Sequence, residues 1–259
     1  MARFCDSISA PSVLIFDWHG TLVDTHDAMF SAMEDMLPQL EELGLVERLL
    51  PEDKCRTGDD ARLVRYIRIF RRLHPRILAE RRVSRTDIFN AIFGDDKEAK
   101  LIAHKAYNEA YRRYFGQVKP FQPGAYEYLS ALKAMGIRLA VSTNRNREFL
   151  DRELQTVDEG RWRRLFDATV CADDVTEYKP DPEVILKALE KLGLPADETA
   201  WYVGDSYVDM LTANKAGVSG VFYNGACWES GRIDSWFSHR DAPAAILDSF
   251  EDLMDLLAL

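Results

Sequence analysis

Side chains that could perform chemistry stand together in four short stretches of this sequence. The stretches are DWHGT with Asp17 and His19, STN with Ser142, Thr143 and Asn144, KPDPE with Lys179, and GDSYVD with Gly204, Asp205, Ser206 and Asp209. Carboxylates are preferred ligands of Mg²⁺, hydroxyl and amide groups can hydrogen-bond phosphoryl oxygens, and a lysine can neutralise negative charge. If these stretches meet in the fold, they could carry out a metal-assisted attack on a phosphoryl group.

The elements around the four stretches predict that they do meet. The run Val13–Phe16 is apolar throughout, which is typical of a strand buried on both faces. Beyond residue 117, we predict strands at 137–143, 167–174, 199–205 and 218–224, and helices at 125–136, 147–157, 182–193 and 207–217. This alternation predicts a doubly wound α/β domain with a parallel sheet. Because ligands of such a sheet bind beyond the carboxyl ends of its strands, we expect the chemical residues to converge there.

A block of helical sequence separates the first predicted strand from the others. Apolar residues recur at helical spacing in residues 26–44, 59–78 and 96–115. The second segment places Leu63, Ile67, Phe70, Leu73 and Ile77 on one side and Arg62, Arg65, Arg68, Arg72 and Arg76 on the other. We therefore predict a helical domain of residues 26–116, inserted into an α/β core of residues 1–25 and 117–259. The arginine side is usually a solvated face, and the alternative is that one or two arginines bind a substrate carboxylate or second phosphate.

The composition excludes several classes of function. The 259 residues are 47% hydrophobic and carry a net charge of −10, so the surface as a whole should not attract nucleic acid or an anionic membrane. No run of about 18 apolar residues or secretory signal is evident. The cysteines Cys5, Cys55, Cys171 and Cys227 show no CxxC spacing, which favours reduced thiols in a cytoplasmic protein. The oligomeric state is not indicated.

The four stretches, in this order, resemble the four motifs of the haloacid dehalogenase superfamily. With the helical insert as a cap, the chain resembles phosphoglycolate phosphatase-like members over nearly its whole length. The resemblance implies a Mg²⁺-dependent phosphatase that acts on a small phosphorylated metabolite through an aspartyl-phosphate intermediate. Such members close the cap over their substrate, and the cap sets specificity, so the sequence does not name the substrate.

The resemblance also assigns roles to single residues. It makes Asp17 the nucleophile, with Lys179 paired to Asp17 and to the phosphate. Phosphoryl binding falls to Thr143 and Asn144, with Ser142 as an alternative to Thr143. The implied ligands of Mg²⁺ are Asp17, the backbone carbonyl of His19 and Asp205, supported by Asp209.

His19 departs from the family pattern, which has an aspartate that acts as general acid and then as general base. Such acid–base help is worth about 10²–10⁴-fold in rate. An imidazole can also transfer protons, with a reference pKa of about 6.5 against about 3.9 for aspartate. Both outcomes stay open: His19 is a working proton carrier, or its presence weakens turnover.

Three alternatives to an ordinary phosphatase follow from the same sequence. A weakened active site would leave a binding or regulatory protein on the same fold. A phosphonate-cleaving member would need a lysine of the helical block, for which the candidates are Lys54, Lys97, Lys100 and Lys105. Dehalogenation is disfavoured, since the dehalogenases lack the acid pair that Asp205 and Asp209 supply.

Overall fold

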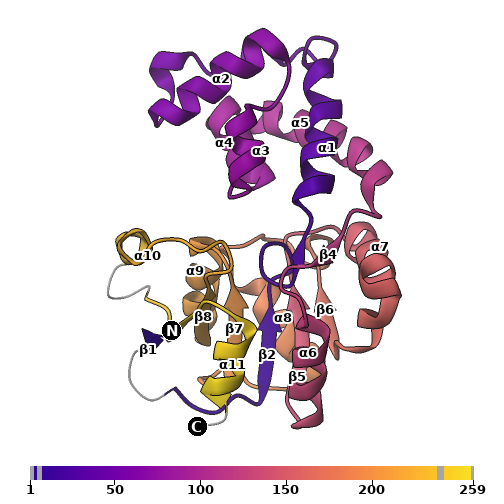
Figure 1. Cartoon of the computed structure of the whole chain (residues 1–259), viewed down its shortest axis with the longest axis vertical. Helices are drawn as coiled ribbons and strands as arrows, with labels where there is room; N and C mark the ends of the chain where they lie inside the picture. The colour runs from indigo at the N-terminus through magenta and orange to yellow at the C-terminus, as the bar shows by residue number, and fades with distance from the viewer. Residues whose placement is uncertain (1–2, 5–7, 238–241, 258–259) are drawn as a thin grey trace. The chain divides into compact units, whose positions relative to one another are not determined.

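Residues 25–117 form one unit of the chain, and residues 1–24 together with 118–259 form the other. We call them the helical unit and the sheet unit. The computed structural model describes residues 3–4, 8–237 and 242–257 (Figure 1). Cys5, which is predicted to be a reduced thiol, lies outside the described residues.

A seven-stranded sheet forms the centre of the sheet unit. Its strand order is β1 (Arg3–Phe4), β9 (Ala245–Leu247), β8 (Ser219–Tyr223), β7 (Ala200–Gly204), β2 (Val13–Phe16), β5 (Arg138–Ser142) and β6 (Ala168–Val170). The edge strand β1 is antiparallel to β9, and the other six strands are parallel to one another. The predicted doubly wound parallel α/β fold is therefore confirmed. A separate antiparallel pair joins β3 (Val23–Asp24) to β4 (Lys119–Pro120).

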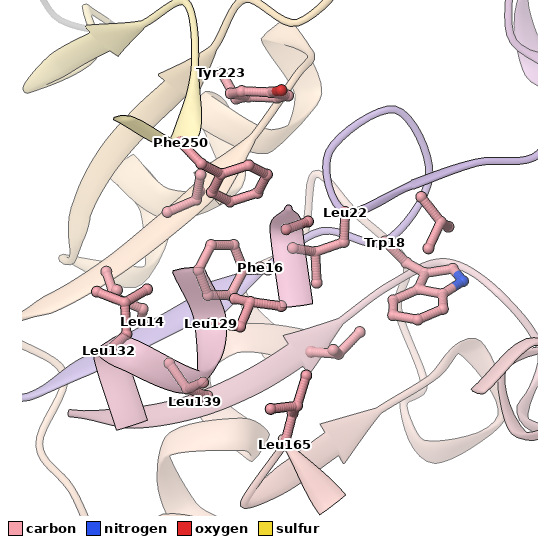
Figure 2. Packing of buried hydrophobic residues seen from close by; sticks show 14 of the residues in the cluster. Leu14, Phe16, Trp18, Leu22, Leu129, Leu132, Leu139, Leu165, Tyr223 and Phe250 are labelled. Atoms are coloured by element: carbon pink, nitrogen blue, oxygen red, sulfur yellow. The ribbon is translucent and has the colours of Figure 1, made fainter. Parts of the chain in front are cut away.

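Apolar residues on alternate positions of the strands bury both faces of the sheet. In β2, Leu14 and Phe16 join one hydrophobic cluster, whereas Val13 and Ile15 join another. Because successive side chains of a strand point to opposite faces, a continuous apolar run is what a doubly covered strand requires. Figure 2 shows the first cluster, in which side chains of β2 and β5 pack against those of α6 and α11.

Helices cover the two faces of this sheet. The helices of the sheet unit are α6 (Ala125–Ala134), α7 (Arg147–Thr156), α8 (Glu183–Leu192), α9 (Tyr207–Ala216), α10 (Ser230–Trp236) and α11 (Phe250–Leu257). Buried residues of α6, α7 and α11 belong to the first cluster, and those of α8 and α9 to the second. Each helix from α6 to α9 lies within a predicted helical segment, but α10, α11 and β9 were not predicted.

The helical unit contains α1 (His26–Met36), α2 (Gly58–Phe70), α3 (Pro75–Glu80), α4 (Arg85–Phe93) and α5 (Lys97–Tyr111). The predicted single apolar side over residues 59–78 is wrong. The helix ends at Phe70, because Arg71 has a left-handed backbone and Pro75 begins a new helix. As a result Phe70 is 55% exposed, while Leu63 is buried. The five arginines of the predicted polar side are exposed, as a solvated face requires: Arg62, Arg65, Arg68, Arg72 and Arg76.

No helix in the described ranges combines the length and the apolar character that crossing a membrane would need.

His104 should make the stability of the protein sensitive to mild acid. Its ring meets the ring of buried Phe89 at 4.7 Å, and burial, with Arg85 and Lys100 nearby, lowers the pKa of His104 from 6.5 to about 4. Below about pH 6.5 the unfolded chain therefore binds a proton that the folded chain excludes, and stability is lost until about pH 4. We expect His104→Leu to remove this loss, so that the stability of the variant relative to wild type increases by about 1–2 kcal/mol from pH 7 to pH 5. Urea unfolding of both proteins at pH 7 and pH 5 measures this difference in the free energy of unfolding. The same change in stability between the two pH values in variant and wild type would contradict the prediction.

Candidate active site

The carboxyl ends of three neighbouring parallel strands bring the predicted chemical residues together. Asp17 directly follows β2, Thr143 follows β5, and Asp205 follows β7. The backbone N–H of Asp17 donates to the carbonyl of Val203 on β7 at 2.8 Å. The backbone of the nucleophile candidate is therefore fixed by the hydrogen bonding between β2 and β7. Lys179 comes from the loop before α8.

The ammonium of Lys179 lies between two carboxylates. Its Nζ donates to Asp17 Oδ1 at 2.6 Å and to Asp209 Oδ1 at 3.0 Å, and the Lys179 side chain is only 4% exposed. The same Nζ lies 5.1 Å from the centre of the Tyr202 ring. Burial acts to lower the pKa of Lys179, but the attraction of Asp17 and Asp209 outweighs it and the pKa is raised. The lysine therefore stays charged beside Asp17.

Three acids crowd around this lysine. One carboxylate oxygen each from Asp17, Asp205 and Asp209 lie within 4.8 Å of one another. Burial raises the pKa of Asp17 to about 6, although Lys179 acts in the opposite direction. Burial, with Asp209 and Asp17 nearby, raises the pKa of Asp205 well above its usual range. One ammonium thus faces three carboxyl groups, and this excess of negative charge suits a divalent cation.

Asp209 serves as a support for Lys179 and for the start of α9. Its Oδ1 also lies 3.2 Å from the hydroxyl of Tyr202, while its Oδ2 accepts the backbone N–H of Ser206 at 3.1 Å and the Ser206 hydroxyl at 2.5 Å. Ser206 caps the helix in return by accepting the backbone N–H of Asp209. Both oxygens are therefore engaged by this chain.

Glycine is required at position 20 by the approach of Asp205. Gly20 has φ +77°, in the left-handed region, and a Cβ there would lie 2.3 Å from Asp205 Oδ2. The hydroxyl of Thr21 lies 3.4 Å from Asp205 Oδ1. The loop after β2 thus brings its backbone against the carboxylate at the end of β7.

The three residues of the STN stretch do different things. Ser142 is buried and donates to the carbonyl of Val184 at 3.0 Å, so its hydroxyl belongs to the packing against α8. Thr143 accepts the backbone N–H of Arg145 at 3.2 Å. Asn144 accepts the backbone N–H of Lys179 at 3.0 Å, and its amide nitrogen lies 3.5 Å from the carbonyl of Lys179. Asn144 therefore holds the backbone of the loop that carries the lysine.

His19 reaches a residue that the sequence analysis missed. Its Nε2 lies 3.6 Å from Oε2 of Glu153, a fully buried acid on α7. Trp18 is also fully buried and donates its Nε1–H to the same oxygen at 2.8 Å. A signal was present in the sequence, because Glu153 stands among the apolar residues Phe149, Leu150, Leu154 and Val157, at the spacing of a buried helix face.

Tyr202 is the second residue that sequence reasoning missed. It lies on β7, fully buried, with its hydroxyl 3.0 Å from the carbonyl of Ser142. Burial and the nearby Asp209 raise its pKa well above the usual value, so the phenol stays protonated. Its position three residues before Asp205, in a strand predicted to end at the site, is the signal that could have found it.

The arrangement offers a carboxylate with a lysine at 2.6 Å, further acids for a cation and an imidazole two residues from the carboxylate. Chemically it can attack an electrophilic phosphorus atom, neutralise the charge that develops and exchange a proton.

Comparisons with known proteins identify relatives that are hydrolases of phosphorylated compounds. Residues 76–222 match the family model described as haloacid dehalogenase-like hydrolase. The chain is 31% identical to pyrophosphatase PpaX of Halalkalibacterium halodurans over 176 residues, 67% of this chain and 75% of that protein. It is 26% identical to phosphoglycolate phosphatase 1 of Pseudomonas aeruginosa over 246 residues, 94% of this chain and 79% of that protein.

A solved structure has the same fold. A HAD-superfamily hydrolase of subfamily IA from Geobacter sulfurreducens superposes with a TM-score of 0.59 at 24% identity, covering 97% of this chain and 100% of that one.

Proposed function

Because the chain belongs to the haloacid dehalogenase-like hydrolase family, we propose that it hydrolyses a small phosphorylated metabolite, with Mg²⁺, through an aspartyl-phosphate on Asp17. The observation that carries the proposal is the buried Lys179 held between Asp17 and Asp209. This pairing keeps the Asp17 carboxylate next to a positive charge at the tip of a strand, where a phosphoryl group could reach it. Relatives named pyrophosphatase and phosphoglycolate phosphatase support a small phosphorylated substrate. We further propose that the protein acts in the cytoplasm, as the cysteine pattern predicts.

The proposed reaction has two halves. In the first, a carboxylate oxygen of Asp17 attacks phosphorus while the bond to the leaving oxygen breaks. A good leaving group departs as an anion, whereas a poor one takes a proton from His19 in the molecules whose imidazole is protonated. In the second, neutral His19 takes a proton from water, whose oxygen attacks the phosphorus of the acyl phosphate. The bond to Asp17 then breaks, which releases inorganic phosphate and restores the carboxylate. Lys179 neutralises charge in both halves, and Thr143 and Asn144 are the proposed phosphoryl-binding residues.

The residues present fit a divalent cation. Three carboxylate groups within 4.8 Å supply the oxygen ligands that Mg²⁺ prefers. Asp17, Asp205 and the backbone carbonyl of His19 would hold the ion, while Asp209, whose oxygens are already hydrogen-bonded, would act through Lys179. When bound, such an ion draws negative charge away from the phosphoryl oxygens.

Phosphate release from a panel of phosphate esters tests the proposal and the role of His19. We expect turnover with Mg²⁺, loss of turnover in EDTA, and higher kcat/KM on aryl and acyl phosphates than on sugar phosphates. The reason is that a good leaving group needs little help from a proton donor, whereas a sugar alcohol does need it. An imidazole that has lost its proton cannot act as that donor. His19→Asp should raise activity on sugar phosphates at least about tenfold.

Each other result has a clear meaning. Equal efficiency on both substrate classes would show that His19 protonates poor leaving groups well. If wild type releases no phosphate but the His19→Asp variant does, the protein is a binding protein in which the histidine prevents turnover. If neither wild type nor His19→Asp releases phosphate with Mg²⁺, the phosphatase proposal is rejected.

A further inference from the structure

A buried acid on α7 links the two loops that flank the active site. The side chain of Glu153 is 0% exposed. Its Oε2 accepts the Trp18 Nε1–H at 2.8 Å and lies 3.6 Å from His19 Nε2, and its Oε1 accepts from the guanidinium of Arg145. Trp18 and His19 are the first and second residues after the nucleophile Asp17, and Arg145 follows Thr143 by two residues.

Glu153 occupies a position that packing alone would fill with an apolar residue. Its neighbours on α7, Phe149, Leu150 and Leu154, are all buried. Taking a carboxylate out of water costs several kcal/mol unless it is paired and hydrogen-bonded. Arg145, whose side chain is 7% exposed, supplies the pairing charge and also lies over the ring of Phe149 at 4.9 Å.

The two donors fix which oxygen faces the imidazole. Arg145 engages Oε1, and Trp18 engages Oε2, so the carboxylate cannot rotate without losing a buried hydrogen bond. Trp18 is itself held in the core (Figure 2) and meets the ring of Trp162 edge-on at 5.9 Å. A rigid carboxylate therefore stands beside His19 Nε2, at a distance that catalytic contacts often show before substrate binds.

We propose that Glu153 is a positioning residue: it holds the imidazole of His19 by Nε2 in the orientation in which His19 exchanges protons at the reacting phosphoryl group. The proposal rests on the proposed phosphatase function and goes beyond it. Carboxylates play this part for metal-bound histidines, where removing the supporting acid costs about 10–100-fold, and for the catalytic histidine of a Ser-His-Asp triad, where it costs about 10⁴-fold. In this chain the support would accompany the replacement of the usual aspartate by histidine.

A double-mutant cycle with an aryl phosphate tests the coupling of the two residues. With this substrate the leaving group needs no proton, so His19 is measured as the base that activates water. We expect Glu153→Gln to lower kcat about 10–100-fold with little change in KM. In the His19→Ala background the same change should lower kcat less than about twofold, because the group to be positioned is gone. An equal loss in both backgrounds would show a purely structural role and overturn the proposal.

Two further variants separate positioning from folding. Glu153→Gln leaves Arg145 as a buried charge, so the paired change Arg145→Met with Glu153→Met keeps the site neutral. We expect this double variant to fold, by thermal unfolding, and still to show the kcat loss; wild-type kcat would overturn the proposal. Asp151→Asn, on α7 with a side chain 51% exposed, is the matched control and should change nothing.

A readout without turnover distinguishes failure of this proposal from failure of the phosphatase assignment. In ¹⁵N NMR of the imidazoles, the His19 signals are identified by their absence in His19→Ala. We expect them to shift in Glu153→Gln and to stay unchanged in Asp151→Asn, whether or not wild type releases phosphate. His19 signals that are identical in wild type and Glu153→Gln would overturn the proposal even in an active enzyme.

Discussion

Replacing Asp17 by asparagine should reduce phosphate release by about 10⁴-fold or more, since no aspartyl-phosphate can form. The substitution keeps the size of the side chain, and Lys179 keeps its hydrogen bond to Asp209 at 3.0 Å, so the fold should survive. The measurement is kcat with Mg²⁺ on the best substrate of the ester panel. Intact-protein mass spectrometry of acid-quenched turnover should detect one phosphoryl group on wild type and none on the variant.

The matched control for this experiment is Asp255→Asn, an exposed acid on α11. Its kcat and phosphoprotein signal should equal those of wild type. A phosphoryl group that persists on Asp17→Asn would place the nucleophile elsewhere, and an unchanged kcat would reject covalent catalysis by Asp17.

Replacing Lys179 by methionine should lower both turnover and stability. The change leaves the buried carboxylates of Asp17 and Asp209 without their shared ammonium, and removing one partner of a buried ion pair typically costs about 3–5 kcal/mol. We expect kcat to fall about 10²–10³-fold, the size of effect seen when one charge-stabilising group is removed. Denaturant unfolding should show a larger loss of stability in EDTA than with Mg²⁺, because a bound cation would neutralise the same carboxylates.

Lys191→Met provides the comparison, since that lysine lies on α8 with a side chain 41% exposed. It should change stability by less than about 0.5 kcal/mol. Equal stability of Lys179→Met and wild type in EDTA would contradict the buried ion-pair arrangement. A stability loss that Mg²⁺ does not reduce would contradict the proposed metal site.

Most of the sheet unit could be predicted from local sequence. The strands β2, β5, β7 and β8 each contain at least three consecutive apolar residues, and a short apolar stretch between two helical segments is typical of a buried strand. The segments that were missed are of another sort. β9 has only three residues and pairs with β8, and three residues are too few for a periodic pattern to predict this pairing. The break between α2 and α3 was missed because helical spacing was followed through Pro75.

The order of residues along the chain is enough to predict which chemical groups the protein has and which edge of the sheet carries them. Asp17, Thr143 and Asp205 each follow a strand, and parallel strands end at one edge, so their convergence follows from topology.

The pairing of these groups, in contrast, depends on the three-dimensional packing of the chain. This packing set Lys179 between Asp17 and Asp209, and it placed Glu153 beside Trp18, a contact that joins positions 135 residues apart. Periodicity reports which face of a helix is buried, but it does not report which distant side chain meets that face, because this depends on how the helix packs on the sheet. The partner of His19 was therefore decided by the packing of α7 and not by any pattern along the chain.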